Sequence, residues 1–264
     1  PGAVDIAKLR LWLSLVVDEE SYDDIQPLPN LDYKIVCGNA LLGFPEKWQS
    51  PATEKVERLK RAYFSETDPE RKATLRAQID AAMQQHLANA EEAIGYPVDF
   101  DFRLFFSEVF HEQGGFDVVI GNPPYVRHER IRDQKPALKE AHPQVYRGTA
   151  DLYVYFYDQG RKVLRERGFL ALITSNKFMR ARYGKKLRRF LAEKTTPHVL
   201  IDFGDLPVFD ATAYPCIVMA QKAPAPANNI VRALTVESVP QIRRITQVMA
   251  QQAWAMPQHK ALTA

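Results

Sequence analysis

Five short segments rich in β-branched and aromatic residues constrain the fold of this chain more than any other feature. They lie at residues 33–39, 116–122, 168–174, 198–204 and 214–222. Apolar runs of this length, bounded by glycine, proline or asparagine, are typical of strands. Segments with a helical pattern or composition separate most of them, at residues 3–18, 52–93, 151–167 and 183–194. This alternation predicts an α/β fold with a mostly parallel sheet that helices cover on both faces.

The last two predicted strands, 198–204 and 214–222, follow each other without a helix between them. We therefore expect them to be antiparallel neighbours, with one antiparallel strand at or near the edge of the sheet. Residues 51–95 are dominated by Glu, Lys, Arg, Gln and Ala, with a break near 65–69. Such a composition predicts a helical hairpin that is inserted into the domain and solvated on most faces.

The remaining segments of the first 150 residues are less regular. Residues 3–18 have a broad apolar face, which predicts a helix lying on a core. Residues 19–32 are acidic and contain proline, and residues 126–149 are basic with little periodicity, so both are predicted to be loops.

Composition and charge exclude several classes of protein. The 264 residues are 46% hydrophobic and 25% charged with a net charge of +3, which is ordinary for a soluble globular chain. Cys37 and Cys216 lie in apolar runs and are expected to be buried, reduced thiols, and no Cys/His cluster indicates a metal site. No apolar run approaches the roughly 20 residues that span a bilayer, and no signal peptide is visible. We therefore expect a cytoplasmic protein with no membrane partner.

The most informative motif, Asn122-Pro123-Pro124-Tyr125, directly follows the predicted strand 116–122. Ligands of parallel sheets bind beyond the carboxyl ends of the strands, which is where this motif lies. Proline has a fixed φ and no N–H, so the motif is expected to form a stiff turn that presents an amide oxygen, a carbonyl and an aromatic ring. A plain turn is the structural alternative.

Two acceptors beside an aromatic face suit an exocyclic amine on a planar base. The lone pair of such a nitrogen is delocalised into the ring, which makes it a poor nucleophile. If the Asn122 side-chain oxygen and the Pro123 carbonyl each accept one N–H, the lone pair can turn toward an electrophile while Tyr125 stacks on the base. A base within a duplex is out of reach, so it has to be flipped out.

The Asn-Pro-Pro-Tyr motif resembles the catalytic motif of S-adenosylmethionine-dependent amino methyltransferases, most often adenine-N6 DNA methyltransferases. Two longer segments, residues 152–191 and 201–222, resemble the γ-class, Eco57I-type (type IIG-like) enzymes of bacterial restriction–modification systems. The resemblance covers residues 1–222. It implies a Rossmann-like class I methyltransferase sheet, S-adenosylmethionine as cofactor, double-stranded DNA as partner, and methyl transfer to the N6 of a flipped adenine.

Carried over to this sequence, the resemblance makes the motif residues the groups that hold the target adenine. Phe209 matches the aromatic residue on the other face of the flipped base, although it could also be a core phenylalanine. Asn39, with Ala40 beside it, matches the polar position that contacts the adenine ring of the cofactor. The structural alternative for Asn39 is a turn residue at the end of a strand.

Basic residues follow two of the predicted strands and have two interpretations. Arg127 follows the motif, and Lys177 and Arg180 follow the strand at 168–174, so all three are candidates for binding DNA phosphates. The alternative is a solvated basic surface. The same choice applies to the wider set: His128, Arg130, Arg132, Arg182, Lys185, Lys186, Arg188 and Arg189. His128 is expected to contact phosphate or have a structural role, because the mechanism requires no general base.

One part of the family pattern is missing. No pair of glycines spaced GxG precedes Asn122, so the glycine-rich loop for the cofactor is expected in an upstream part of the same parent protein. We accordingly predict that residues 1–222 are a partial methyltransferase domain lacking its N-terminal strands, which binds cofactor poorly by itself and is inactive. Residues 223–264 are predicted to be a linker and the start of a target-recognition region. A non-catalytic DNA-recognition module, or a methyltransferase acting on RNA or protein glutamine, are the alternatives.

Overall fold

A computed structural model of the chain describes residues 2–17, 31–45, 51–209 and 214–263. The chain divides into two compact units, residues 1–108 and 109–264, and each is described by itself. Most of the predicted loop at 19–32 lies outside the described residues. The helices up to the first strand are α1 (Gly2–Val16), α2 (Pro51–Ser65), α3 (Pro69–Ile94), α4 (Phe102–Phe105) and α5 (Ser107–Gln113).

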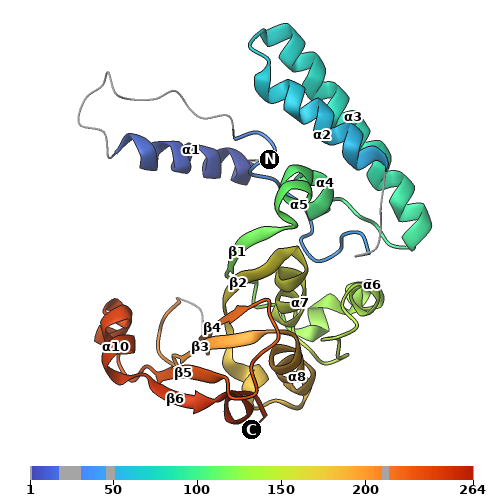
Figure 1. The fold of residues 1–264 in the computed structure, drawn as a ribbon. Coiled ribbons are helices and arrows are strands. Elements are labelled where there is room, and N and C mark those ends of the chain that lie inside the picture. Colours follow the sequence, from blue (N-terminus) through green and yellow to red (C-terminus); the bar gives the residue numbers. More distant parts are fainter. Residues whose placement is uncertain (1, 18–30, 46–50, 210–213, 264) are drawn as a thin grey trace. The chain divides into compact units, whose positions relative to one another are not determined.

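The first unit contains the predicted helical hairpin, formed by α2 and α3 (Figure 1). Local signals define α3: Asp68 caps its first turn by accepting a hydrogen bond of 2.8 Å from the Arg71 N–H, and Pro69 occupies the first helical position. Gly95, at φ 79°, ends the helix in the left-handed conformation. The hairpin has a small core of its own, which includes Val56, Tyr63, Ile79, Met83 and Leu104.

Two expectations for the first unit are wrong. Residues 33–39 form turns instead of a strand: the Lys34 and Ile35 N–H groups bond back to the Leu31 carbonyl at 3.1 and 3.3 Å. A β-rich sequence forms a strand only beside another strand, and the described residues before 116 contain none. In addition, α1 does not lie on a core, since Ile6 and Leu9 are 56% and 52% exposed. The sequence pattern of α1 correctly predicted a helix. Its apolar side chains are buried, however, only where another part of the protein packs on them.

The second unit is built on a six-stranded sheet with the order β1-β2-β4-β3-β5-β6 (Figure 1). The strands are β1 (Phe116–Gly121), β2 (Leu164–Ser175), β3 (Thr196–Asp202), β4 (Pro215–Gln221), β5 (Ile230–Thr235) and β6 (Trp254–Pro257). Strands β1, β2, β3 and β5 run in one direction, whereas β4 and β6 run in the other. This arrangement confirms an α/β fold with a mostly parallel sheet.

The predicted pair β3 and β4 is antiparallel, as expected. However, β4 lies between β2 and β3 inside the sheet, and the antiparallel strand at the edge is β6. The difference arises because β5 and β6 extend the sheet beyond β3. The stretch after residue 222, predicted to be a linker and a new region, is an irregular connection up to residue 229 and then supplies these two strands.

The helices of this unit are η2 (His128–Gln134), α6 (Lys135–Ala141), α7 (Tyr153–Val163), η3 (Asn176–Met179), η4 (Arg182–Gly184), α8 (Lys185–Lys194), α9 (Val239–Arg243), α10 (Ile245–Gln252) and α11 (Gln258–Thr263). The prediction of a loop at 126–149 is therefore wrong over η2 and α6. Buried Ile131 and Leu138 anchor these two helices, and two apolar residues in a basic segment are too few to give a visible period.

The sheet is covered on one face over β1 and β2 and only partly on the other. Helix α7 packs on the face that contains Val119 and Leu170, where a Cβ added to Gly160 would touch both side chains. On the opposite face, Val118 and Ile120 of β1 are 51% and 80% exposed. That face is covered near β3 and β5, where α9 and α10 help to enclose a core around Ile201. The expectation of cover on both faces is thus wrong at β1.

Candidate active site

The predicted motif lies where expected, directly beyond the carboxyl end of β1. Residues 122–127 have no regular structure; Pro123 is buried, and Asn122 and Tyr125 are exposed. The turn is closed by a hydrogen bond of 2.9 Å from the Val126 N–H to the Pro124 carbonyl. The buried proline anchors the turn, so the amide and the phenol ring on either side face outward.

Phe209, 84 positions after Tyr125, lies beside it. The ring centroids are 6.0 Å apart, and the planes meet at 61° in an edge-to-face contact. Carbon atoms pack best at about 3.5–4 Å, so a base stacked between two parallel rings needs about 7–8 Å between them. The two rings in this structure are therefore adjacent but too close to hold a base without separating and turning.

A pocket of about 90 Å³ adjoins the motif at the carboxyl ends of β1 and β2. It is lined by Tyr125, Arg127, Asp151, Tyr153, Ser175, Lys177 and Tyr214. The sequence analysis had singled out three of these residues and missed the other four. The only sequence signal for Asp151 and Tyr214 was their position just before α7 and β4, two elements that begin at this edge of the sheet.

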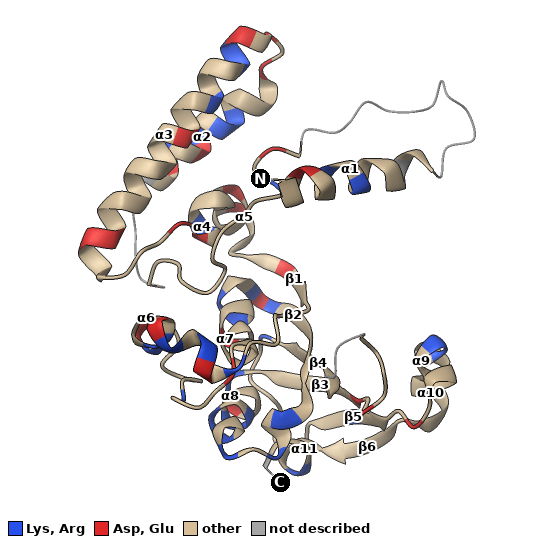
Figure 2. Cartoon of the chain, turned by 180° about the vertical axis from the view of Figure 1, so that it is seen from behind, with Lys and Arg blue, Asp and Glu red and all other residues tan. Residues whose placement is uncertain are grey.

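Basic side chains border the pocket. Arg127 and Lys177 line it, and the Lys177 ammonium lies 5.8 Å from the centroid of the Tyr214 ring, in cation–π range. Arg180 is exposed on the turn after η3 but does not line the pocket. Lys and Arg also gather over α8 (Figure 2).

Not all of the basic cluster is free for a ligand. The Arg188 guanidinium donates to the Phe178 and Ala181 carbonyls at 2.6 and 3.3 Å, which is a structural role. Arg189 pairs with Glu193 one turn later in α8, at 2.7 Å. The His128 imidazole is also engaged, since its Nδ1 lies 3.6 Å from Asp151 Oδ1.

Two weakly acidic groups near the motif, the Tyr125 phenol and the Cys216 thiol, stay neutral at ordinary pH. Burial raises the pKa of Tyr125 to about 12, and it raises the pKa of Cys216 to about 12. A neutral phenol can stack on a base and donate a hydrogen bond, but it cannot act as a base. Neither group therefore offers a general base, and what they can supply at the motif is packing and hydrogen bonds.

The two cysteines differ in exposure. Cys216 is buried in β4, as expected, whereas Cys37 is exposed and the prediction of a buried thiol there is wrong. The reason is the absence of a strand at 33–39, since a turn does not bury alternate side chains.

Asn39 and Ala40 lie in the first unit, in the turns that follow residue 33. The Asn39 side-chain oxygen accepts a hydrogen bond of 3.0 Å from the Leu41 N–H, and its own N–H donates to Asp99 at 3.0 Å. This is the local geometry of an asparagine turn. The cofactor role of these two residues stays a prediction.

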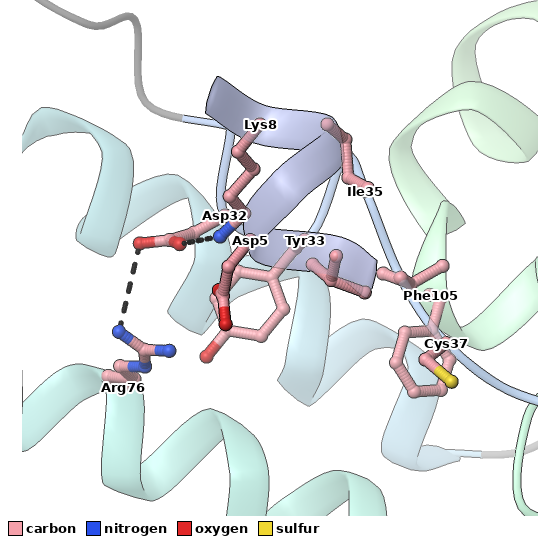
Figure 3. Close-up of a pocket in the computed structure, with 10 residues that line it drawn as sticks. Asp5, Lys8, Asp32, Tyr33, Ile35, Cys37, Arg76 and Phe105 are labelled. Atoms are coloured by element: carbon pink, nitrogen blue, oxygen red, sulfur yellow. Dashed lines mark hydrogen bonds and ion pairs between the residues drawn. The ribbon is translucent and has the colours of Figure 1, made fainter. Parts of the chain in front are cut away.

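A second pocket, of about 250 Å³, lies in the first unit (Figure 3). Its charged groups are engaged with each other: Asp32 accepts from Lys8 at 2.7 Å and from the Tyr63 hydroxyl at 2.6 Å, and Arg76 lies 3.9 Å away. Burial alone would raise the pKa of Asp32, but these donors outweigh it and lower the pKa. Asp32 thus connects α1, α2 and α3.

No glycine-rich cradle for a cofactor is found among the described residues of the first unit. Among its described residues no strand is followed by a glycine-rich turn. Two of its glycines serve tight packing instead: a Cβ at Gly38 would collide with Phe100, and a Cβ at Gly43 would lie 2.6 Å from the Asp101 carboxylate. The described part of the chain also holds no cluster of three His, Cys, Asp or Glu side chains suited to a metal ion, and no helix in that part is long and apolar enough to cross a membrane.

Comparison with known proteins identifies the family. The model of the Eco57I restriction-modification methylase family matches residues 1–209. The chain belongs to this family. Among relatives of this Eco57I-family chain, the type II methyltransferase M.BstVI of Geobacillus stearothermophilus is 36% identical over 145 residues, covering 54% of the chain and 25% of the relative. The type II restriction enzyme and methyltransferase RM.Eco57I of Escherichia coli is 34% identical over 111 residues, covering 40% and 11%.

The Eco57I-family chain thus matches a quarter or less of the length of these relatives. Among solved structures, a methyltransferase subunit of a type I restriction–modification system from Streptococcus thermophilus has a TM-score of 0.40 at 14% identity. That match covers 55% of this chain and 35% of the other.

Proposed function

We propose that this chain is the target-base part of a type II restriction–modification methyltransferase that modifies the exocyclic N6 of adenine in double-stranded DNA. The observation that supports this most is the contact between Tyr125 and Phe209, at 6.0 Å, beside the Asn122 turn. Eighty-four positions separate the two rings in the sequence, so their meeting at this turn is a property of the fold. Two rings that meet beside two amine acceptors suit a flipped base, which they can hold once they separate and turn parallel.

The chemistry assigned to the chain is positioning. The Asn122 side chain and the Pro123 carbonyl accept the two N–H bonds of the amine, and the two rings hold the base. Arg127, Lys177 and Arg180 are exposed at or near this site and would bind phosphates, which makes binding salt-dependent.

We further propose that S-adenosylmethionine is the methyl donor and that polypeptide outside this chain binds most of it. The absence of a glycine cradle in the described part of the first unit supports this division, as do the exposed Val118 and Ile120 on β1. Strand β1 lies at the edge of the sheet, and no described strand pairs with its outer side. An exposed apolar edge strand is a surface for pairing with another strand.

The first experiment measures S-adenosylmethionine binding to the chain by calorimetric titration. No measurable binding is expected; micromolar affinity would contradict the proposed division of the cofactor site.

The second experiment uses the longer protein that contains this chain, with Asn122→Ala as the variant and exposed Asn228→Ala as the matched control. Methyl transfer is measured on plasmid DNA, on RNA and on a glutamine-containing protein substrate. Loss of one preorganised acceptor is expected to lower kcat on plasmid adenine by on the order of 10²–10³, whereas the control keeps full activity. Undiminished adenine methylation by Asn122→Ala, or transfer only to RNA or glutamine, would exclude the proposal. No transfer to any substrate by the wild type would favour a non-catalytic DNA-recognition module.

A further inference from the structure

Two hydrogen bonds connect the motif loop to the segment that starts α7. The His128 N–H donates to Asp151 Oδ1 at 3.0 Å, and the Leu152 N–H donates to the Val126 carbonyl at 2.9 Å. Residues 122–127 have no regular structure, so these bonds replace the ladder or helix bonds that would otherwise hold the loop. Of these two acceptors, the Val126 carbonyl belongs to the backbone and is present with any residue. The Asp151 carboxylate is a side chain, so that bond depends on the residue type.

The Asp151 side chain connects the loop to the pocket, because it accepts from the His128 N–H and also lines the pocket. It is 17% exposed and lines the pocket with Tyr125 and Arg127. Below it, the Tyr153 and Tyr183 hydroxyls are joined at 2.9 Å. Burial raises the pKa of Tyr183 to about 12, and the negative charge of Asp151 acts in the same direction. The Asp151 carboxylate therefore interacts with the neutral Tyr183 phenol and also holds the loop through the His128 N–H.

The hydrogen bond to Asp151 fixes the backbone at His128, three positions after Tyr125. Fixing the backbone at His128 and at Val126 limits the directions in which the Tyr125 ring can point, because few single-bond rotations remain between the fixed amides and the ring. The two rings must separate to admit a base, since 6.0 Å between their centroids is too little, and a Tyr125 ring that is held in place leaves this movement to Phe209.

We propose that Asp151 is a positioning residue: through the amide of His128 it holds the loop so that Tyr125 forms a fixed wall of the base pocket. The role belongs to its acceptor oxygen and not to its negative charge. The inference rests on the proposed function of the site as a pocket for a flipped base. Nothing in the motif itself predicts it, because the residue lies 26 positions after Tyr125 in the sequence.

Two variants separate the acceptor from the charge. Asp151→Ala removes both, whereas Asp151→Asn keeps an oxygen that can accept from the His128 N–H. The matched control is Asp133→Ala, because Asp133 is exposed in η2 of the same region.

The first measurement is amide hydrogen exchange of the chain at residues 126–128. In Asp151→Ala the His128 N–H loses its acceptor, which is expected to raise exchange at this amide about 10- to 100-fold. Asp151→Asn should stay within a few-fold of wild type, as should the control. Amides of α7 report whether the variants fold. If Asp151→Ala leaves exchange at His128 unchanged, or if Asp151→Asn behaves like the alanine variant, the positioning role is wrong.

The second measurement uses the longer protein with duplex DNA that contains 2-aminopurine at the target position, whose fluorescence rises when the base leaves the stack. Asp151→Ala is expected to lower this signal and to reduce kcat more than KM, and Asp151→Asn should restore both. Normal signal and kcat in Asp151→Ala would overturn the proposal. If exchange changes as expected but the wild type flips and methylates no base, the loop anchor stands and the proposed function fails, so the two failures are distinguishable.

Discussion

Removal of the Asp158 charge is expected to destabilise the second unit more than removal of any exposed carboxylate. Asp158 lies on α7 and is 1% exposed. One of its oxygens, Oδ2, lies 2.7 Å from His142 Nδ1 and 2.7 Å from Lys162 Nζ. Lys162 also donates to the Ala141 carbonyl at 2.5 Å. The network therefore joins the end of α6 to α7, the helix whose first residue, Tyr153, lines the pocket.

The loss of stability depends on how far the positive partner of Asp158 remains buried after the substitution. Breaking a buried ion pair by removing one partner costs about 3–5 kcal/mol, because the other charge is left uncompensated. The Lys162 side chain is 21% exposed and can reach water in part, so we expect the lower end, about 3 kcal/mol, for Asp158→Asn. In a unit of this size each kcal/mol shifts the melting temperature by about 2–4 °C, which gives a decrease of about 6–12 °C.

The assay is thermal unfolding of the chain followed by circular dichroism and calorimetry at pH 7. The matched control is Asp117→Asn, which breaks the Asp117–Arg165 pair; that pair has a similar N–O distance of 2.6 Å, but its side chains are 60% and 43% exposed. An exposed pair of this kind contributes at most about 1 kcal/mol. Equal melting temperatures for Asp158→Asn and the control would refute the reasoning, because burial would then have no influence on the value of the pair.

Three further predictions concern pH, thiol chemistry and packing. Burial acts to raise the pKa of Asp158, but the His142 hydrogen bond and the Lys162 charge outweigh it and lower the pKa. Its contribution is therefore complete above the ordinary aspartate pKa of about 4 and is lost as pH falls through the lowered folded value. Acid titration of wild type and Asp158→Asn should show that their difference in stability shrinks as pH falls below about 4, and a difference that grows there would contradict this. Cys37, exposed, should react with a thiol reagent in the folded chain, whereas Cys216, buried with its pKa raised to about 12, should react only after unfolding; equal rates would contradict it. Gly184→Ala would drive a Cβ into the Phe178 carbonyl, which should cost about 2 kcal/mol or more in urea unfolding, and unchanged stability would mean that the turn before α8 can shift.

Much of the secondary structure was predictable because its causes are local. The α2–α3 hairpin has its cap, its N-terminal proline and its terminal glycine within a few residues of each break. Strands β1 to β4 have β-branched apolar runs with turn residues at their ends. The turn at Asn122–Tyr125 was predicted because two prolines fix backbone geometry wherever they occur, and its chemistry stays a prediction.

The remaining predictions failed where a residue's state depends on a neighbour far away in the chain. Residues 33–39 had the composition of a strand but lack a strand beside them in the described structure, so they form turns and expose Cys37. The same holds for α1, whose helical pattern was right but whose Ile6, Leu9 and Leu11 side chains are exposed in the described structure. The place of β4 well inside the sheet was not predicted. The reason is that β5 and β6, which extend the sheet beyond β3, were not predicted as strands.

The amino-acid sequence alone determined the kind of fold, the turn beyond β1 and the residue types at that turn. The tertiary structure decided which side chains join them: it brought Phe209 within 6.0 Å of Tyr125, and it placed Asp151 where its oxygen accepts from the His128 amide at 3.0 Å. The physical reason is that propensity and capping act over a few residues. Contacts across 84 or 23 positions exist only once a common sheet edge has brought the segments together.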